Sequence, residues 1–496
     1  MTAPTLVPDW LSHRARVSPS KPALLAGAAT LTFAELDAAA TTAASRLLTS
    51  GVNSGDHVAL LASNSIEYAV AVFGVTRAGA VLVPINTRLS PAEIAWQLAD
   101  SDAAGVVVDK TLRSRLADAS GPPILDLEAL TARATEVPLA AERVDLARTL
   151  AIIYTSGTTG VPKGAMLTYG NFFWNAAGSA LNLGLHNDDC WLACMPLFHV
   201  GGLSILLRGA IYGMTVEVHD GFDPVSVNQA LGSGRVTIVS LVATMLRRLL
   251  DRQAGGYHPN LRCVLLGGGP VPPDLLQECL RRGIPVAQTY GLTEAASQVS
   301  TLLPAEAVAR PGSAGQPLLP VEVRIEGESG ATCAPGAPGE IVIRGPTVAS
   351  GYYKRPATDA AFSDGWFHTG DFAYADADGY LYIVDRRDDV IVSGGENVYP
   401  AEVEGVLGAH GDVVDAGVFA LEDAVWGQRV AAVVSLLPGS HASAAALEAL
   451  CRERLAAYKA PKAFYCLGEL PRNASGKLLR RELRRLAQDG ALRPLD

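Results

Sequence analysis

The sequence predicts an α/β protein with a large N-terminal domain, at residues 1–387, and a small α+β domain at 388–496. Over the first two hundred residues, short apolar runs alternate with amphipathic segments, which is typical of layered α/β domains with largely parallel sheets. From about Val321 the pattern changes to short alternating strands broken by Gly and Pro, which indicates a β-rich subdomain. At 496 residues the chain is also too long for one hydrophobic core.

Capping residues and hydrophobic periods locate the first elements. Thr32 and Glu35 have the spacing of a capping box, which predicts the start of an Ala-rich helix that runs towards Leu48. Apolar runs and the helical period then predict one further helix, at 66–76, and three strands, at 57–61, 81–84 and 105–108.

Later elements follow from the same signals. Strands at 264–266 and 286–290 each lead into a Gly-rich or polar segment, and the carboxyl ends of such strands are where ligand-binding loops are expected. The β-rich subdomain and the C-terminal domain are predicted to contain strands at 321–325, 340–344, 414–419 and 430–436, and helices at 444–455, with Ser443 as its N-cap, and from about 478 onwards.

Composition restricts the class of protein and its partners. Hydrophobic residues make up 49% of the chain and charged residues 18%, which is the profile of a packed protein. The net charge of −10 argues against nucleic acid or an anionic membrane as a partner. Seven cysteines without a framework spacing fit a reducing compartment, and no signal peptide or membrane-spanning run is present. We therefore expect a cytoplasmic protein without an integral membrane segment.

Residues 154–164 read Tyr-Thr-Ser-Gly-Thr-Thr-Gly-Val-Pro-Lys-Gly. Their backbone N–H groups, hydroxyls and the charge of Lys163 suit the phosphates of a nucleotide. The segment is not a Walker P-loop, because Pro162 precedes the lysine and Gly164 follows it. An apolar run precedes the segment and an amphipathic stretch follows it, so we expect a strand–loop–helix joint.

Five further segments accompany this loop, in the order in which they occur in one known superfamily. Together the six resemble the motifs of the adenylate-forming enzymes, which include acyl-CoA synthetases, luciferases and peptide-synthetase adenylation domains. The resemblance runs from within the first third of the chain almost to its end, and the segments are 154–164, 288–294, 366–371, 385–389, 394–404 and 471–477.

The resemblance implies ATP, Mg²⁺ and coenzyme A as ligands, and it assigns residues to the nucleotide. Thr293 would bond to the α-phosphate, Glu294 and Thr155 would hold Mg²⁺, and Tyr290 would lie against the adenine ring. Asp371 would accept bonds from the ribose, supported by Arg386. The remaining nucleotide-binding residues implied are Thr155, Ser156, Gly157, Thr158, Thr159, Gly160, Lys163, Gly268, Gly269 and Gly291.

The resemblance also implies two half-reactions with a rotation of the small domain between them. Lys477 would stabilise charge during adenylation, and Asp388 would be the hinge. After the rotation, Gly395 would face the pantetheine of coenzyme A, because a glycine permits close backbone approach.

The resemblance also implies an acyl pocket that contains His199, Arg208, Gly267, Ser297 and Gln298, with His199 gating the carboxylate. Residues 179–184, 196–199, 211–216, 265–270 and 293–298 resemble the segments of those superfamily members that activate 2-succinylbenzoate for menaquinone biosynthesis. That acid has a second carboxylate, and the resemblance places a basic residue at position 208 against it. The neighbours of Arg208 in the sequence are apolar. Arg208 could lie on a solvent-facing side of a helix, or it could be buried beside an anionic partner.

Other readings remain as alternatives. The same chemistry could act on a medium-chain or aromatic monoacid, which would leave Arg208 unexplained. A carrier-loading adenylation enzyme would lead us to expect a downstream carrier domain, and the chain ends at Asp496. A non-catalytic nucleotide-binding protein would not need Lys477. The spacing of Cys190, Cys194 and His199 resembles a zinc site, which we reject because a second ligand pair is missing. A homodimer is compatible with the sequence.

Overall fold

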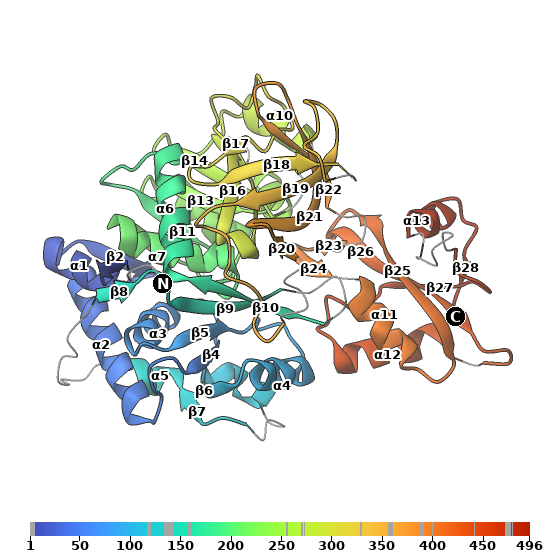
Figure 1. Ribbon diagram of the computed structural model, residues 1–496, viewed down its shortest axis with the longest axis horizontal. Coiled ribbons are helices and arrows are strands. Elements are labelled where there is room, and N and C mark those ends of the chain that lie inside the picture. The colour runs from blue at the N-terminus through green and yellow to red at the C-terminus, as the bar shows by residue number, and fades with distance from the viewer. Residues whose placement is uncertain are drawn as a thin grey trace.

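The computed structural model contains a layered N-terminal domain and a smaller C-terminal lobe, coloured orange to red in Figure 1. It describes residues 5–116, 121–132, 143–155, 161–253, 256–268, 271, 273–327, 330–355, 361–386, 391–398, 400–440, 442–471, 478 and 480–496.

The first sheet of the N-terminal domain is largely parallel, as the sequence predicted. In spatial order it contains β10 (Lys163–Thr168), β9 (Thr149–Thr155), β5 (Val81–Pro84), β4 (His57–Leu61), β6 (Ala103–Val108) and β7 (Ile124–Asp126). Helices α3 (Ile66–Arg77), α4 (Pro91–Asp100) and α5 (Leu127–Thr131) and the 3₁₀-helix η1 (Lys110–Leu116) lie between these strands in the chain. Residues 57–61 and 81–84 form strands with the predicted bounds.

The second sheet has nine strands, and its central part is parallel. In spatial order it contains β17 (Gln316–Pro317), β16 (Ser297–Leu302), β15 (Val286–Leu292), β14 (Cys263–Leu266), β13 (Ile238–Leu241), β11 (Cys190–Ala193), β12 (Thr215–Val218), β2 (Pro22–Ala26) and β3 (Ala29–Thr32). The helices that accompany it are α6 (Tyr169–Leu183), α7 (Val200–Tyr212), α8 (Pro224–Gly232), α9 (Ala243–Leu250) and α10 (Pro273–Arg281).

The largest hydrophobic core joins the two sheets. It contains buried residues of both sheets, such as Leu60 of β4 and Trp191 of β11. Helix α2 (Phe33–Thr49) follows its N-cap Thr32, where the predicted capping box with Glu35 is present in full. It lies in this core with α3, α6, α7 and α1 (Trp10–Val17), and a short pair of strands, β1 (Leu6–Pro8) and β8 (Arg143–Asp145), completes this part of the domain.

The predicted β-rich subdomain and the C-terminal domain each have a sheet of their own. The subdomain contains β18 (Glu322–Glu326), β19 (Gly339–Arg344), β20 (Phe362–Ser363), β21 (Trp366–Ala375) and β22 (Leu381–Arg386). The C-terminal sheet contains β23 (Ile391–Ser393), β24 (Glu396–Val398), β25 (Val413–Asp423), β26 (Gly427–Leu436), β27 (Ala463–Cys466) and β28 (Arg493–Pro494), with α11 (Pro400–Gly408), α12 (Ala444–Arg454) and α13 (Arg480–Gln488). The change from one sheet to the next falls between Arg386 and Ile391, and the expected hinge Asp388 lies outside the described residues.

One sequence prediction about this fold was wrong. Residues 154–164 do not form a strand–loop–helix joint, because β9 is followed by an antiparallel strand, β10, in which Lys163 pairs with Thr155. Helix α6 begins only at Tyr169, after its N-cap Thr168. Strand β10 has only three consecutive apolar residues, Ala165 to Leu167, so it shows no period-two pattern in the sequence. The described residues of β9 and β10 therefore pair as two antiparallel strands, and α6 begins only after β10.

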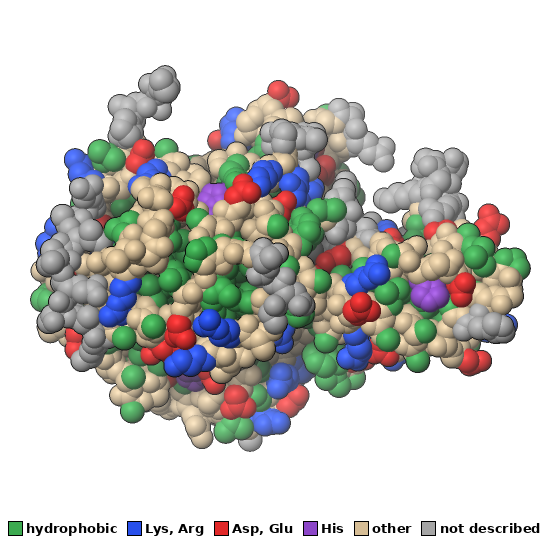
Figure 2. Space-filling model, turned by 90° about the horizontal axis from the view of Figure 1, so that it is seen from below, with side chains coloured by type: hydrophobic (Ala, Val, Ile, Leu, Met, Phe, Trp, Pro, Cys, Tyr) green, Lys and Arg blue, Asp and Glu red, His purple; other side chains and the backbone are tan. Residues whose placement is uncertain are grey.

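The surface shown in Figure 2 has Lys and Arg side chains interspersed with Asp and Glu, so the net charge of −10 is not gathered in one patch on that face. Within the described residues, no helix is long and apolar enough to cross a membrane.

Candidate active site

The carboxyl ends of several strands converge on one cavity of about 680 Å³, a size typical of small-molecule sites. Strand β9 supplies Thr155, the segment after β13 supplies Val242, and the segment after β14 supplies Gly267. The C-terminal domain also lines this cavity, with Gly395, Glu396, Tyr458 and Lys459. The cavity therefore lies at the junction of the two domains.

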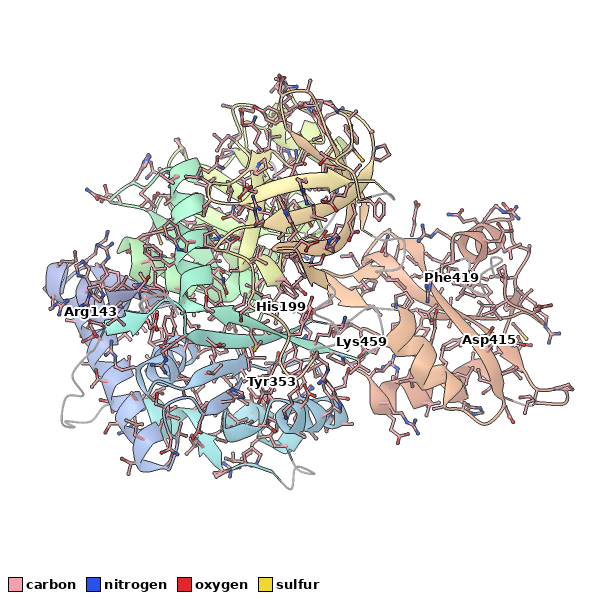
Figure 3. The ribbon with its side chains drawn as sticks, in the orientation of Figure 1. Arg143, His199, Tyr353, Asp415, Phe419 and Lys459 are labelled. Carbon is pink, nitrogen blue, oxygen red and sulfur yellow. The ribbon has the colours of Figure 1, made fainter. Side chains whose placement is uncertain are left out.

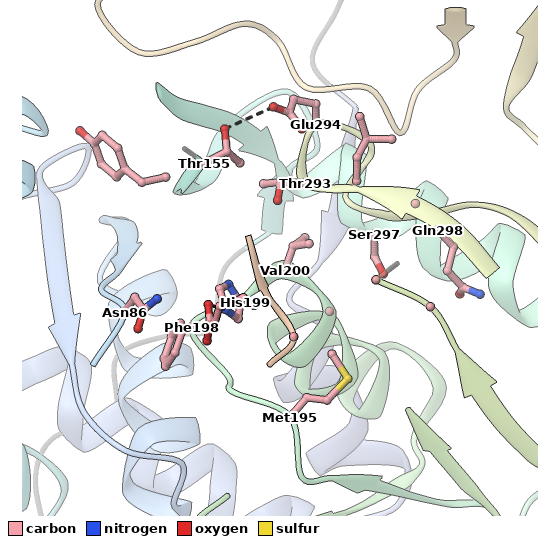
Figure 4. Close-up of a pocket in the computed structure, with 18 of the residues that line it drawn as sticks. Asn86, Thr155, Met195, Phe198, His199, Val200, Thr293, Glu294, Ser297 and Gln298 are labelled. Carbon is pink, nitrogen blue, oxygen red and sulfur yellow. Dashed lines mark hydrogen bonds and ion pairs between the residues drawn. The ribbon is translucent and has the colours of Figure 1, made fainter. Parts of the chain in front are cut away.

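Most of the described residues predicted for the site line this one cavity. They are Thr155, Lys163, His199, Arg208, Gly267, Gly268, Gly291, Thr293, Glu294, Ser297, Gln298, Asp371 and Gly395. Figure 4 shows His199, Phe198 and Met195 opposite Ser297 and Gln298. Ser156, Gly157, Thr158, Thr159, Gly160, Gly269 and Lys477 lie outside the described residues, as does the side chain of Arg386.

Glu294 stands at the centre of an oxygen-rich group. It belongs to the short 3₁₀-helix η2 (Thr293–Ala295), and only 9% of its surface is exposed. The hydroxyl of Tyr352 donates to Glu294 Oε1 at 2.7 Å, and the hydroxyl of Thr155 lies 3.4 Å from the same atom (Figure 4). Burial lowers the pKa of Lys163, and attraction to Glu294 opposes that effect. One carboxylate, two hydroxyls and one ammonium thus lie in the same cavity wall, and together they suit a phosphate chain and a hard cation.

The segment that follows Glu294 has an unusual backbone, and neighbouring helices hold it in place. Ala296 and Ser297 have φ angles of 57° and 119°, which side-chain-bearing residues adopt only under constraint. The amide of Asn175, on α6, donates to the carbonyls of Ala295 at 3.0 Å and Gln298 at 2.8 Å. The chain also approaches itself closely here, since a Cβ at Gly291 would lie 1.8 Å from the Ser297 carbonyl oxygen.

Arg208, on α7, is buried in the wall of the cavity with 2% of its surface exposed. Its Nη2 donates to Asn175 Oδ1 at 2.6 Å, and its guanidinium lies 5.3 Å from the centre of the Trp191 ring. Among the described residues, Arg208 has no carboxylate partner and its Nε has no acceptor. Burial accordingly lowers its pKa. The structure thus decides between the two sequence readings: Arg208 is buried, and its charge is available to the cavity.

Asn175 connects Arg208 to the backbone of residues 295–298, which follow Glu294. Both of its N–H groups are used by backbone carbonyls, so its oxygen must face the guanidinium. The sequence did not reveal this residue, because a single Asn within an amphipathic helix carries no motif.

A second polar group crosses the boundary between the domains. Glu396, which follows Gly395, is buried and accepts from Arg88 at 2.7 Å, while His199 Nε2 lies 3.2 Å from its second oxygen. Burial raises the pKa of Glu396, but attraction to His199 and Arg88 outweighs burial and lowers it. The sequence motifs indicate His199 and Gly395 separately and do not mark Glu396, although Glu396 lies within residues 394–404.

Asp371, the expected ribose-binding residue, lies in the cavity wall on β21. The hydroxyl of Tyr290 donates to Asp371 Oδ2 at 2.7 Å, and the ring of Tyr290 belongs to the core beneath the β-rich subdomain. Tyr290 therefore orients Asp371, and its expected contact with adenine stays a prediction.

The fold and the site define a class of enzyme, and comparison with known families identifies it. Residues 11–353 match the family model of the AMP-binding enzymes, and residues 402–477 match that of the AMP-binding enzyme C-terminal domain. The chain belongs to the AMP-binding enzyme family, which confirms the family predicted from the six motifs.

Particular relatives are similar over nearly the whole chain. The 2-succinylbenzoate–CoA ligase of Geobacillus kaustophilus (strain HTA426) is 50% identical over 484 residues, which cover 97% of this chain and 98% of that protein. Among solved structures, o-succinylbenzoate CoA synthetase (MenE) from Bacillus subtilis is 42% identical. The closer resemblance seen in the sequence is therefore confirmed.

Different complexes of the Bacillus subtilis protein match this structure to different degrees. The double mutant bound with its product analogue OSB-NCoA gives a TM-score of 0.94 and covers 99% of this chain and 100% of that one. The complexes with the acyl-adenylate intermediate OSB-AMP and with ATP and magnesium ion give 0.75 and 0.76, and they cover 97% of this chain and 98% and 100% of those chains. The sequence identity is equal, so the arrangement of the elements makes the difference.

The environment of Asn175 leads to a stability prediction. Asn175→Leu removes the oxygen that faces Arg208 and both donors to the 295–298 backbone. We expect the free energy of unfolding of the N-terminal domain to fall by about 3 kcal/mol, because buried polar groups are left without partners. Urea denaturation measures this change. Asn260→Ala, which removes one exposed bond to the Gly234 carbonyl, is the control and should shift stability little. Equal effects would contradict this role of Asn175.

Proposed function

We propose that the protein is an ATP-dependent, AMP-forming acid–CoA ligase that converts 2-succinylbenzoate to 2-succinylbenzoyl-CoA through an acyl adenylate, in menaquinone biosynthesis. One observation carries the choice of acid. Arg208 is buried, has no carboxylate partner among the described residues, and lines the same cavity as Lys163 and Glu294, which suit the phosphates and the metal. The near full-length relatives that bear this enzyme name support the proposal.

In the first half-reaction a carboxylate oxygen of the acid forms a bond to the α-phosphorus of ATP, and pyrophosphate leaves. Both reactants are anions, so the site must neutralise charge and align them. Lys163 supplies a positive charge beside Thr155, and Thr293 lies on the same wall for the α-phosphate. Asp371, oriented by Tyr290, accepts from the ribose hydroxyls. Lys477 completes the charge stabilisation, as the family resemblance implies.

The residues around Glu294 fit a magnesium ion. Its carboxylate and the Thr155 hydroxyl are hard oxygen donors that lie close together in the cavity wall. When bound there, the ion would shield the negative charge of the phosphates. Tyr352 donates to the carboxylate and thereby fixes its direction.

The second carboxylate of the acid would complete the environment of Arg208. Asn175 occupies only one side of the guanidinium, and Nε has no acceptor among the described residues. A carboxylate matches this planar donor group and would compensate a buried charge. A monoacid would leave that charge without a counterion, so recognition of a dicarboxylate follows from the cost of the uncompensated group.

The described arrangement of domains suits the second half-reaction, in which the thiol sulfur bonds to the acyl carbon and AMP leaves. Gly395 lies in the cavity wall with φ +84°, and a Cβ there would lie 3.4 Å from Val242 Cγ2. The high similarity to the relative bound with its product analogue supports this assignment.

The setting of the protein is part of the proposal. All seven cysteines are free thiols, which supports a reducing compartment such as the cytoplasm. A homodimer stays a prediction from the sequence.

Arg208→Ala tests the choice of acid. We expect kcat/KM for 2-succinylbenzoate to fall about 100-fold or more, since breaking a buried charge pair from one side costs several kcal/mol. Activity on 4-oxo-4-phenylbutanoate, which lacks the ring carboxylate, should change little. Pyrophosphate release with each acid is the measurement. Arg208→Lys keeps the charge without the planar fork and should give an intermediate loss. Equal losses on the two acids would make Arg208 structural.

Glu294→Gln tests the metal site, because Gln keeps the shape of the side chain without its charge. Adenylation should slow, and half-maximal activity should require more Mg²⁺. A Mg²⁺ titration of ATP–pyrophosphate exchange measures both effects. Tyr352→Phe is the matched control, because it removes the hydrogen bond to Glu294 and keeps the carboxylate. An unchanged Mg²⁺ requirement in Glu294→Gln would remove this residue from the metal site.

Lys477→Ala and Gly395→Leu separate the two half-reactions. Lys477→Ala should abolish adenylate formation and retain thioester formation from supplied acyl adenylate. Gly395→Leu should do the reverse, because its side chain would be strained at positive φ and would obstruct the pantetheine. The readouts are ATP–pyrophosphate exchange and coenzyme A consumption from synthetic adenylate. Equal damage to both steps in both variants would contradict two separate domain arrangements.

A further inference from the structure

A lysine of the C-terminal domain is buried against the N-terminal domain. Lys459 lies at the junction of the two domains in Figure 3, and only 3% of its surface is exposed. Its Nζ donates to Glu402 Oε1 at 2.7 Å and to Glu93 Oε1 at 2.8 Å. Glu402 belongs to α11 of the same domain, whereas Glu93 belongs to α4 of the N-terminal domain. One ammonium thus joins carboxylates that are far apart in the chain.

The ammonium of Lys459 remains charged in this buried place. Burial lowers its pKa, but attraction to Glu402, Tyr458 and Glu93 outweighs burial and raises it. The pKa of Glu402 is raised, because burial outweighs the attraction of Lys459. A buried charge of this kind depends strongly on its partners, so removing one carboxylate has a large effect on the position of the other groups.

Glu93 is held in place before it reaches across the junction. Its Oε2 accepts from the backbone N–H of Ser90, and its own N–H donates to Ser90 Oγ, so the two residues form a capping box at the start of α4. The second oxygen, Oε1, is directed to Lys459. The cap fixes the side chain, and therefore little conformational freedom is lost when the ion pair forms.

The two contacts of Lys459 differ in their dependence on domain orientation. The pair with Glu402 lies within one domain and survives any rigid rotation. The pair with Glu93 exists only when the C-terminal domain stands as it does here. This arrangement matches the relative bound with its product analogue at a TM-score of 0.94, against 0.75 and 0.76 for the complexes with OSB-AMP and with ATP.

We propose that Lys459 and Glu93 form an interdomain latch, a pair of positioning residues that selects the domain arrangement for thioester formation. The latch rests on the proposed function, because it requires two half-reactions in two arrangements. Glu93 does not line the cavity, so its effect is on the population of one arrangement. Losing the pair shifts that population away from thioester formation and leaves the adenylation arrangement intact.

Glu93→Gln is the test variant. Gln at this position of a capping box can still accept from the Ser90 N–H, so the cap of α4 is kept while the charge that faces Lys459 is lost. The chain offers a matched control in Glu35→Gln, because Glu35 forms the same capping box with Thr32 at the start of α2, in the N-terminal domain. Each variant is assayed for ATP–pyrophosphate exchange and, in single turnover, for thioester formation from supplied acyl adenylate and coenzyme A.

We expect Glu93→Gln to slow thioester formation roughly ten-fold or more, as loss of an interdomain ion pair shifts the two-state equilibrium, with exchange within about two-fold of the wild type. Glu35→Gln should resemble the wild type in both assays. Unchanged thioester formation in Glu93→Gln, or equal losses in both assays, would overturn the latch.

A second measurement separates the latch from general damage. Lys459→Met removes the same pair from the other side, so adding Glu93→Gln to it should cause little further loss of thioester formation; additive losses would overturn the latch. Different results would contradict the latch and the proposed function. If the wild type forms no adenylate with 2-succinylbenzoate, the choice of acid fails, and the latch is measured with whichever acid the wild type activates.

Discussion

A buried guanidinium that lacks a carboxylate among the described residues is the constraint on which the site depends. Arg208 lies in the cavity wall with 2% of its surface exposed, and Asn175 is its one side-chain hydrogen-bond partner described. The same amide of Asn175 holds the backbone on both sides of Ala296 and Ser297, next to Glu294. Asn175 therefore links recognition of the acid by Arg208 to the position of residues 295–298. An anion from the substrate would compensate the charge of Arg208.

Charge also governs the junction of the domains. Glu396 meets Arg88 and His199, and Lys459 meets Glu93, so ions of each domain are compensated by the other. A buried ion that keeps its partner is stabilised, whereas a buried ion that loses its partner destabilises the interface strongly. The interface consequently favours one defined arrangement, in which Gly395 lies in the cavity wall.

Local signals in the sequence were enough for most elements and for the family. The capping box of α2 and the bounds of β4 and β5 depend on neighbouring residues alone, and the structure contains them as predicted. Strand β10 was missed because its three consecutive apolar residues, Ala165 to Leu167, show no period-two pattern. Asn175 and Lys459 were missed for a different reason: their roles depend on distant partners, and Glu93 is 366 positions from Lys459. No local pattern marks such pairs.

The most direct test of the account is a crystal structure of the protein with a non-hydrolysable adenylate analogue of 2-succinylbenzoate. We expect the ring carboxylate to lie within hydrogen-bonding distance of the Arg208 guanidinium, at about 2.7–2.9 Å, with Nε as one of the donors. Asn175 should remain on Nη2. A ring carboxylate that faces solvent or another group, with Arg208 unchanged, would contradict the claim that this buried charge selects the acid.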